Sequence, residues 1–196
     1  MSTAAWSPVS LAVLCAGVGY GHPTRLLADW VTEAVCRSLA AGRARAEVEV
    51  LELHRPAVDL AQHSAHDRVS LDLREAIAAV VAADGLVVAT PVLAASPSEV
   101  FDSCFAALGD KVLSGMPVLL ALNSGSRWQP PDLAQVLRRR LTSVHADPVP
   151  TIVADPADPA DPADWPATAH SDAARLRTCI DQAAAELAVA MRSHRQ

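Results

Sequence analysis

A glycine-rich segment near the amino terminus, CAGVGYGHPTR at residues 15–25, carries the residue types that bind an anion. An apolar run precedes it and a helical pattern follows it, so its backbone N–H groups lie where a helix begins and where the helix dipole favours negative charge. Thr24 and Arg25 could add a hydroxyl and a cation. Close approach of a ligand to the backbone is permitted by Gly17, Gly19 and Gly21. The segment predicts a phosphate site, while a tight turn alone would also explain the glycines.

This segment matches neither of the common nucleotide-binding motifs. His22 stands where the third glycine of Gly-x-Gly-x-x-Gly would be, so a dinucleotide fingerprint is absent. The sequence also has no Gly-Lys-Ser/Thr for the phosphates of a nucleoside triphosphate. The predicted anion site is therefore not assigned to either ligand class by its motif.

Other reactive side chains form weaker patterns. His63 and His66 are three residues apart, close to Asp59 and Asp67, and could place two metal ligands on one helical face. No motif fixes a third ligand, so a polar surface loop is the favoured interpretation. Ser96 and its neighbours lack the Gly-x-Ser-x-Gly elbow of a hydrolase.

The elements that must position the predicted anion site alternate along the chain. Short, continuously apolar or period-two segments predict strands at 9–15, 47–53, 85–90, 117–122 and 149–153. Three- and four-residue apolar spacing predicts helices at 23–41, 71–83, about 98–113, 131–142 and 170–192. Right-handed crossovers then give an α/β three-layer sandwich with a five-stranded parallel sheet.

One domain covering residues 1–196 is expected, because a chain of this length can bury a full core. Asp-Pro-Ala repeats at 155–164 predict a Pro-rich linker at 155–166 before the last helix. Ligands of such sheets bind outside the carboxyl ends of the strands. Three loops, 16–24, 90–98 and 123–129, should therefore meet there.

Composition and charge indicate which binding partners and which cellular compartment to expect. The net charge of −6 disfavours nucleic acid, and the arginines at 138–140 are interpreted as a solvated helix face. The four cysteines are scattered without metal-ligand spacing, which fits a reducing cytoplasm. No apolar run approaches the roughly 20 residues needed to span a bilayer, so no membrane partner is expected.

Three segments, in this order, carry a family resemblance: TRLLAD at 24–29, DGLVVATPVLAAS at 84–96 and GMPVLLALNSGSRW at 115–128. Over residues 9–153 the chain resembles the NADPH-dependent FMN reductase family, which has a flavodoxin-like fold. The resemblance implies FMN as cofactor, NADPH as reductant and a homodimer. A flavin carries the hydride chemistry itself, so no catalytic side chain is predicted.

The resemblance also implies site residues. Around the FMN phosphate it places Gly17, Gly19, His22, Thr24 and Arg25. Along the isoalloxazine ring, after the third strand, it places Pro91, Val92, Leu93, Ala94 and Ser96. On the other side of the ring, after the fourth strand, it places Ser124, Gly125 and Arg127, with Arg127 near the flavin or the nicotinamide. Trp128 could contact either ring or anchor its own loop.

Several positions depart from the family pattern. Gly19, His22 and Pro23 stand where serines usually bind the phosphate, and Ala94 stands where an asparagine is typical. Ser124 replaces the first glycine of a usual pair. Each lost hydrogen bond to a charged group costs about 1.5 to 3 kcal/mol, which predicts weak FMN binding.

Three classes of function are compatible with the sequence. The first is an NAD(P)H-dependent FMN reductase-like flavoprotein oxidoreductase. The second is a flavodoxin-fold protein that has lost flavin binding and acts as a partner or accessory subunit. The third is an enzyme that uses the same cleft for another small anion. Whether the chain is an enzyme stays open at this point.

Overall fold

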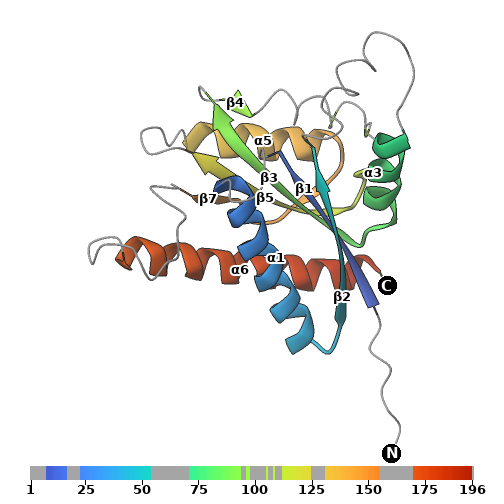
Figure 1. Cartoon of the computed structure of the whole chain (residues 1–196), viewed down its shortest axis with the longest axis horizontal. Coiled ribbons are helices and arrows are strands. Elements are labelled where there is room, and N and C mark those ends of the chain that lie inside the picture. The colour runs from blue at the N-terminus through green and yellow to red at the C-terminus, as the bar shows by residue number, and fades with distance from the viewer. Residues whose placement is uncertain are drawn as a thin grey trace, which may run out of the picture.

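The structure is a computed structural model that describes residues 8–16, 23–53, 71–93, 96–97, 105, 108, 112–124, 131–154 and 170–195. Its strands are β1 (Pro8–Cys15), β2 (Arg45–Glu52), β3 (Gly85–Leu93), β4 (Ser96–Pro97), β5 (Pro117–Ser124), β6 (Asp147–Pro148) and β7 (Ile152–Ala154). Its helices are α1 (Pro23–Ala41), α3 (Leu71–Ala82), α5 (Pro131–Ser143) and α6 (His170–His194). Figure 1 shows α1 crossing α6, and the two helices pack against each other.

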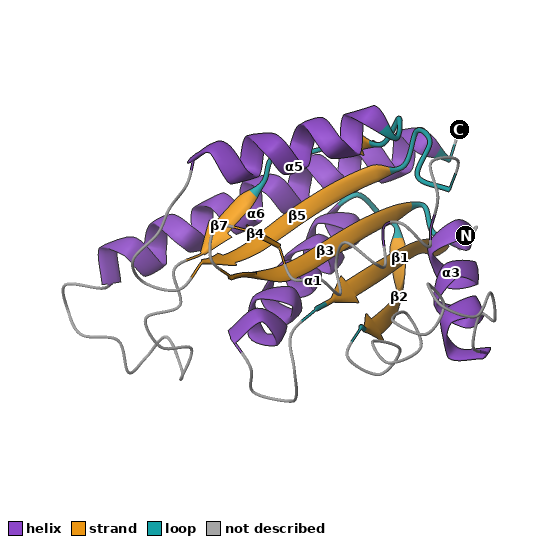
Figure 2. Ribbon diagram, turned by 90° about the horizontal axis from the view of Figure 1, so that it is seen from above, coloured by secondary structure: helices purple, strands orange, loops and turns teal. Residues whose placement is uncertain are grey.

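The strands form one sheet in the order β2-β1-β3-β5-β6, with β7 also paired to β5. Figure 2 shows β2, β1, β3, β5 and β7 of this sheet. All of these pairs are parallel, and only the two-residue β4 runs antiparallel, beside the end of β3. The predicted doubly wound α/β sandwich is therefore confirmed. The small β3–β4 hairpin is an addition that the sequence analysis did not anticipate.

Two apolar layers cover the two faces of the sheet. Successive strand residues point to opposite faces, so β1 sends Val9, Leu11 and Val13 to one layer and Ala12 and Leu14 to the other. The first layer is completed by α1 and α6, the second by α3 and α5. Continuous apolar sequence in β1, β3 and β5 reflects this burial on both faces.

At the two edges of the sheet, β2 is more exposed than the central strands, and β6 and β7 are short. β2 pairs on one side with β1, and its Val48 and Val50 are exposed by 39% and 37%, as expected of an edge strand. The strand predicted at 149–153 is instead two short strands: β6 pairs with the start of β5, and β7 pairs with its end. The register against β5 shifts by one residue between the two short strands, since Val118 pairs with Pro148 but Ala121 pairs with Ile152, so one extra residue interrupts the ladder.

The remaining sequence-based elements are partly outside the described residues. Phe105 and Leu108 of the helix predicted at about 98–113 are helical, whereas residues 112–115 form turns. The predicted linker at 155–166 is outside the described residues. None of the helices in the described part of the chain is long and apolar enough to cross a membrane.

Candidate functional site

The carboxyl ends of four strands meet beside the start of α1. Ala16, after β1, donates a backbone hydrogen bond to Ala89 of β3 at 2.8 Å, and Leu53, after β2, donates to Cys15 at 2.9 Å. β5 extends as far as β3 here, because Pro91 pairs with Asn123. This edge is where an open parallel sheet of this kind binds its ligands.

Thr24 connects the first turn of α1 to the end of β5. Its side chain is completely buried, and its Oγ1 accepts a hydrogen bond from Asn123 Nδ2 at 3.1 Å. Asn123 is also buried, at 6% exposed. A buried polar pair of this kind is stable because each group satisfies the other. The contact fixes the helix start at the ligand edge, and the predicted contact of Thr24 with a phosphate stays a prediction.

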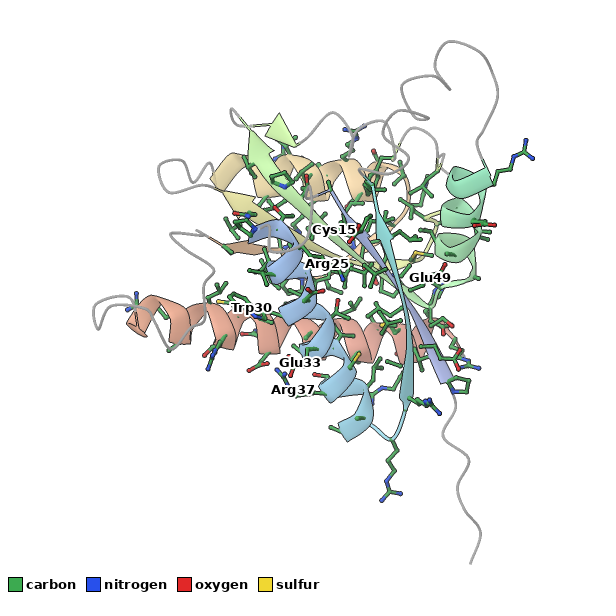
Figure 3. All side chains as sticks on the ribbon, in the orientation of Figure 1. Cys15, Arg25, Trp30, Glu33, Arg37 and Glu49 are labelled. Carbon is green, nitrogen blue, oxygen red and sulfur yellow. The ribbon has the colours of Figure 1, made fainter. Side chains whose placement is uncertain are left out.

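Arg25 lies one residue further along, at the point where β1 ends and α1 begins (Figure 3). Its Nε donates to Asp29 Oδ1 at 2.9 Å, and its Nη1 donates to Glu52 Oε1 at the end of β2. The Arg25 side chain is 18% exposed and that of Glu52 is 13% exposed. Burial lowers the pKa of Arg25, but the carboxylates of Asp29 and Glu52 outweigh it and raise that pKa. The predicted phosphate cation is thus already engaged by two carboxylates.

The third strand carries the residues predicted to line the flavin. Pro91 and Val92 lie in the last part of β3 and are half-buried. Leu93 pairs with Ser96 and Val92 pairs with Pro97 in the β3–β4 hairpin. This hairpin stands at the same sheet edge as the start of α1.

The other predicted site residues divide into two groups. Ser124 is the last residue of β5, where it pairs with Val92. The structure therefore brings Thr24, Arg25, Pro91, Val92, Leu93, Ser96 and Ser124 to one edge of the sheet. Outside the described residues are Gly17, Gly19, His22, Ala94, Gly125 and Arg127.

Two residues of this edge were not selected from the sequence. Asn123 was interpreted only as the start of a loop, and Glu52 only as a polar position of an alternating strand. The signal available was their place at the ends of two predicted strands, since Glu52 lies near the end of the strand predicted at 47–53 and Asn123 directly follows the strand predicted at 117–122. Their partners, Thr24 and Arg25, are distant in sequence, so the contacts depend on the strand order rather than on a local motif.

Two further sequence-based predictions concern residues away from this edge. His63 and His66 are outside the described residues. Within the described part of the chain, no three His, Cys, Asp or Glu residues are grouped so that they could hold a metal ion. Trp30 packs partly buried against the α1 side of the core, as expected of a packing residue.

Comparison with protein families shows which family the chain belongs to. The model of the family described as NADPH-dependent FMN reductase matches residues 9–159. The chain belongs to this family. The sequence-based prediction of an FMN reductase-like flavoprotein oxidoreductase is therefore confirmed, and none of the comparisons supports an accessory protein without flavin. No curated protein matches the sequence of this family member.

Comparison with solved structures finds oxidoreductases and a flavodoxin that are similar to this chain. An oxidoreductase from Corynebacterium diphtheriae is 32% identical, with a TM-score of 0.83, covering 94% of this chain and 97% of that one. An NADH:FMN oxidoreductase in its apo form is 20% identical, with a TM-score of 0.67, covering 91% and 90%. A flavodoxin from Megasphaera elsdenii is 16% identical, with a TM-score of 0.56, covering 89% and 98%. The last two matches show the flavodoxin-like fold alone.

Proposed function

We propose that this FMN reductase family member binds FMN weakly at the carboxyl edge of its sheet and uses NADPH as its reductant. The observation that carries the proposal is the arrangement at the start of α1, where a buried Thr24–Asn123 contact fixes the helix end and Arg25 lies beside it. FMN, when bound, supplies the hydride-accepting group. The chain supplies the binding surface and the orientation.

The described residues fit a phosphate at this place. The first backbone N–H groups of a helix have no partner within the helix, and α1 is long enough, at 19 residues, to have a full dipole. Arg25 adds a guanidinium that is held at the sheet edge by Glu52 and Asp29. The residues at 17–22 supply the remainder of this proposed phosphate site.

The Arg25 ion pairs also support weak binding. A phosphate that contacts Arg25 must share the guanidinium with Glu52, and the Glu52 carboxylate repels the phosphate charge. Both effects lower the free energy that Arg25 contributes to binding. This contribution adds to the loss of serine donors at Gly19 and His22 that the sequence indicates.

The flavin ring, on this proposal, lies along the end of β3. Pro91 and Val92 provide apolar, half-buried surface there, and the β3–β4 hairpin brings Leu93 and Ser96 to the same edge. We place Ala94, Gly125 and Arg127 around the same ring, as the family resemblance implies.

The assembly and compartment are proposed on separate grounds. Family resemblance supports a homodimer, which sedimentation at micromolar concentration would detect and a monomer would contradict. Cys36 and Cys179 have free thiols, which supports a reducing cytoplasm. The coenzyme preference would come from steady-state rates with NADPH and NADH.

A calorimetric FMN titration tests the proposed cofactor. We expect a dissociation constant that Arg25→Ala raises by about one to two powers of ten, because a charge-assisted contact of about 1.5 to 3 kcal/mol is lost. Arg37→Ala is the matched control, since Arg37 also pairs with two carboxylates but lies on the α6 side of α1. Ala94→Asn should lower the constant by restoring the ring contact that is typical of the family.

The titration also separates the proposed function from its alternatives. Absence of FMN binding at millimolar concentration, in the parent chain and in Ala94→Asn alike, would contradict the flavoprotein assignment. NADPH oxidation that appears only when FMN is added would support it. A flavin-independent response to another anion would favour the third class of function instead.

A further inference from the structure

An open cleft separates the middle of α5 from the interruption between β6 and β7. Its volume is about 810 Å³, within the usual range for small-molecule sites. Gln135, Arg138 and Arg139 line it from α5, and Pro150 and Thr151 line it from the interrupted strand. The cleft therefore exists at the place where the fifth strand position is broken.

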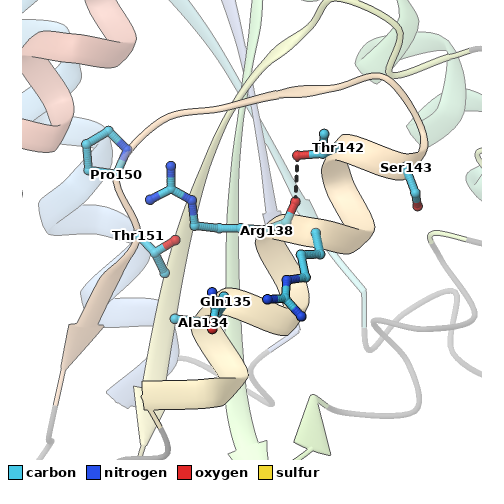
Figure 4. Close-up of a pocket in the computed structure, with 8 residues that line it drawn as sticks. Ala134, Gln135, Arg138, Thr142, Ser143, Pro150 and Thr151 are labelled. Atoms are coloured by element: carbon cyan, nitrogen blue, oxygen red, sulfur yellow. Dashed lines mark hydrogen bonds between the residues drawn. The ribbon is translucent and has the colours of Figure 1, made fainter.

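Thr151 presents an unsatisfied polar atom at this cleft. Its Oγ1 is inaccessible to solvent and has no hydrogen-bond partner among the described residues. The nearby Thr142 hydroxyl, by contrast, donates to the carbonyl of Arg138 at 3.0 Å (Figure 4). A buried hydroxyl without a partner is unfavourable, and a bound group that hydrogen-bonds to it would remove the penalty.

Two arginines provide the charge of the cleft. The Arg138 side chain extends from α5 across the cleft toward Thr151 and Pro150 (Figure 4). Neither Arg138 nor Arg139 forms an ion pair with another described residue, whereas Arg25 and Arg37 each contact two carboxylates. Although the chain has a net charge of −6, the side chains of the described residues that line this cleft carry two positive charges and no negative charge.

We propose that this cleft binds a phosphate group of a small molecule. A guanidinium offers two parallel N–H donors that match the oxygens of a phosphate, and two guanidiniums from adjacent residues can bind different oxygens. The Gln135 amide can donate to a further oxygen, and the Thr151 hydroxyl would do the same once the side chains that cover it in this structure move aside to admit the ligand. No covalent step is involved, because every contact is a hydrogen bond or an ion pair.

Two sources of such a phosphate are chemically equivalent here. One is the 2′-phosphate of NADPH, which rests on the proposed function, since α5 is the next described element after β5, whose carboxyl end lies at the ligand edge. The other is a free phosphate or a separate phosphorylated metabolite, which does not require flavin binding. Kinetics with NADPH and NADH distinguish the two sources.

Inorganic phosphate is the probe for the site itself. We expect titration at constant ionic strength to shift the backbone amide resonances of Gln135 and Thr151, and the apparent dissociation constant to rise about tenfold in Arg138→Ala. Arg177→Ala is the matched control, since Arg177 is an exposed arginine on α6 and its substitution removes the same positive charge. Its constant should equal that of the parent chain.

A second variant tests the unsatisfied hydroxyl. Thr151→Val keeps the side-chain shape and removes only the hydroxyl, so the folded chain should keep its thermal midpoint or gain a little. Its phosphate affinity should fall about threefold to tenfold. Unchanged affinity in both Thr151→Val and Arg138→Ala, or an equal loss in Arg177→Ala, would overturn the proposal.

The source is decided by kinetics with the two nicotinamide coenzymes. If the cleft holds the 2′-phosphate, Arg138→Ala raises the KM for NADPH about tenfold and leaves the KM for NADH unchanged. If it holds a free phosphate, both KM values stay the same while the resonance shifts are still lost. Failure of the proposed flavin function would leave the phosphate titration intact, so the two failures are distinguishable.

Discussion

Arg25 is the residue where structural and ligand-binding roles compete. It joins the end of β2 to the start of α1 through Glu52, and it is the cation that a phosphate at the helix start would contact. The strength of phosphate binding therefore depends on how tightly the two carboxylates hold the guanidinium. A residue outside the predicted phosphate loop, Glu52, would control the affinity of that loop.

The first prediction concerns Glu52→Gln. Removing this charge releases the Arg25 guanidinium and removes a carboxylate that repels the phosphate, so the dissociation constant for FMN should fall about tenfold. Glu33→Gln is the control, because the exposed Glu33 side chain pairs with Arg37 rather than with Arg25 (Figure 3). Weaker FMN binding in Glu52→Gln would show instead that the ion pair orients Arg25 for the ligand.

The second prediction concerns the reactivity of Cys36. Burial raises the pKa of this thiol, and the charge of Glu33 raises it further. A raised pKa leaves less thiolate at a given pH, so iodoacetamide at pH 8 should modify Cys36 more slowly than the exposed Cys179. The rate at Cys36 should rise with pH beyond the range of an ordinary thiol and increase in Glu33→Gln. Peptide mapping by mass spectrometry measures both rates, and equal rates at pH 8 would contradict the raised pKa.

At the scale of elements, local patterns predicted most of the structure. Continuous apolar sequence identified β1, β3 and β5, because strands covered on both faces have no polar side. The interruption between β6 and β7 was missed because Val149, Ile152 and Val153 are apolar and resemble one strand. Its consequence, the cleft beside α5, depends on the packing of two elements and has no local pattern.

Contacts between elements were harder to predict than the elements themselves. The alternation in β2 indicated an edge strand, but the partner of Glu52 follows from the register of β2 against β1 and from the path of α1. The Asn123–Thr24 contact likewise joins residues 99 positions apart. Sequence position at the end of a strand indicated the neighbourhood of the site, and only the structure gave the pairs.

The third prediction tests the packing of β3 against α6. A Cβ added at Gly85 would lie 2.5 Å from Met191 Cγ, and Met191 is fully buried. Gly85→Ala should therefore lower the free energy of unfolding by about 1 to 3 kcal/mol. Met191→Ala should cost about 2 to 5 kcal/mol by itself, and adding Gly85→Ala to it should cost little more, because the clash is gone.

Gly115 provides the control for this pair of substitutions, because it is required for its backbone conformation and not for the space beside Met191. Gly115 has a φ of +74°, a left-handed conformation that side chains with a Cβ disfavour. Gly115→Ala should cost about 1 kcal/mol through backbone strain, and Met191→Ala should not relieve it. Urea unfolding of the two double variants measures the difference. Additive losses for Gly85→Ala and Met191→Ala would show that the two side chains do not share space.

At the scale of the whole molecule, one of the two apolar layers depends on helices from opposite ends of the sequence. The layer under α1 includes residues of α6, and α6 also contacts β3, β5 and β7. Helices cover both faces of a parallel sheet, so the loss of one of these helices exposes the apolar strands beneath it. The family match ends at residue 159, yet α6 beyond it belongs to the same core.

The last prediction is that the chain cannot fold without α6. Ile180, Leu187 and Met191 of this helix are buried, and each contributes about 1.5 to 3 kcal/mol on burial, so their sum approaches the about 5 to 15 kcal/mol that stabilises a typical domain. A chain ending at Ala154 should therefore lose its cooperative thermal transition, followed by circular dichroism. Deleting one Asp-Pro-Ala unit, residues 158–160, is the control and should leave the transition within a few degrees, because the sequence predicts a linker there. A truncated chain that still unfolds cooperatively near the parent midpoint would show that the sheet is stable with α1 alone on that face.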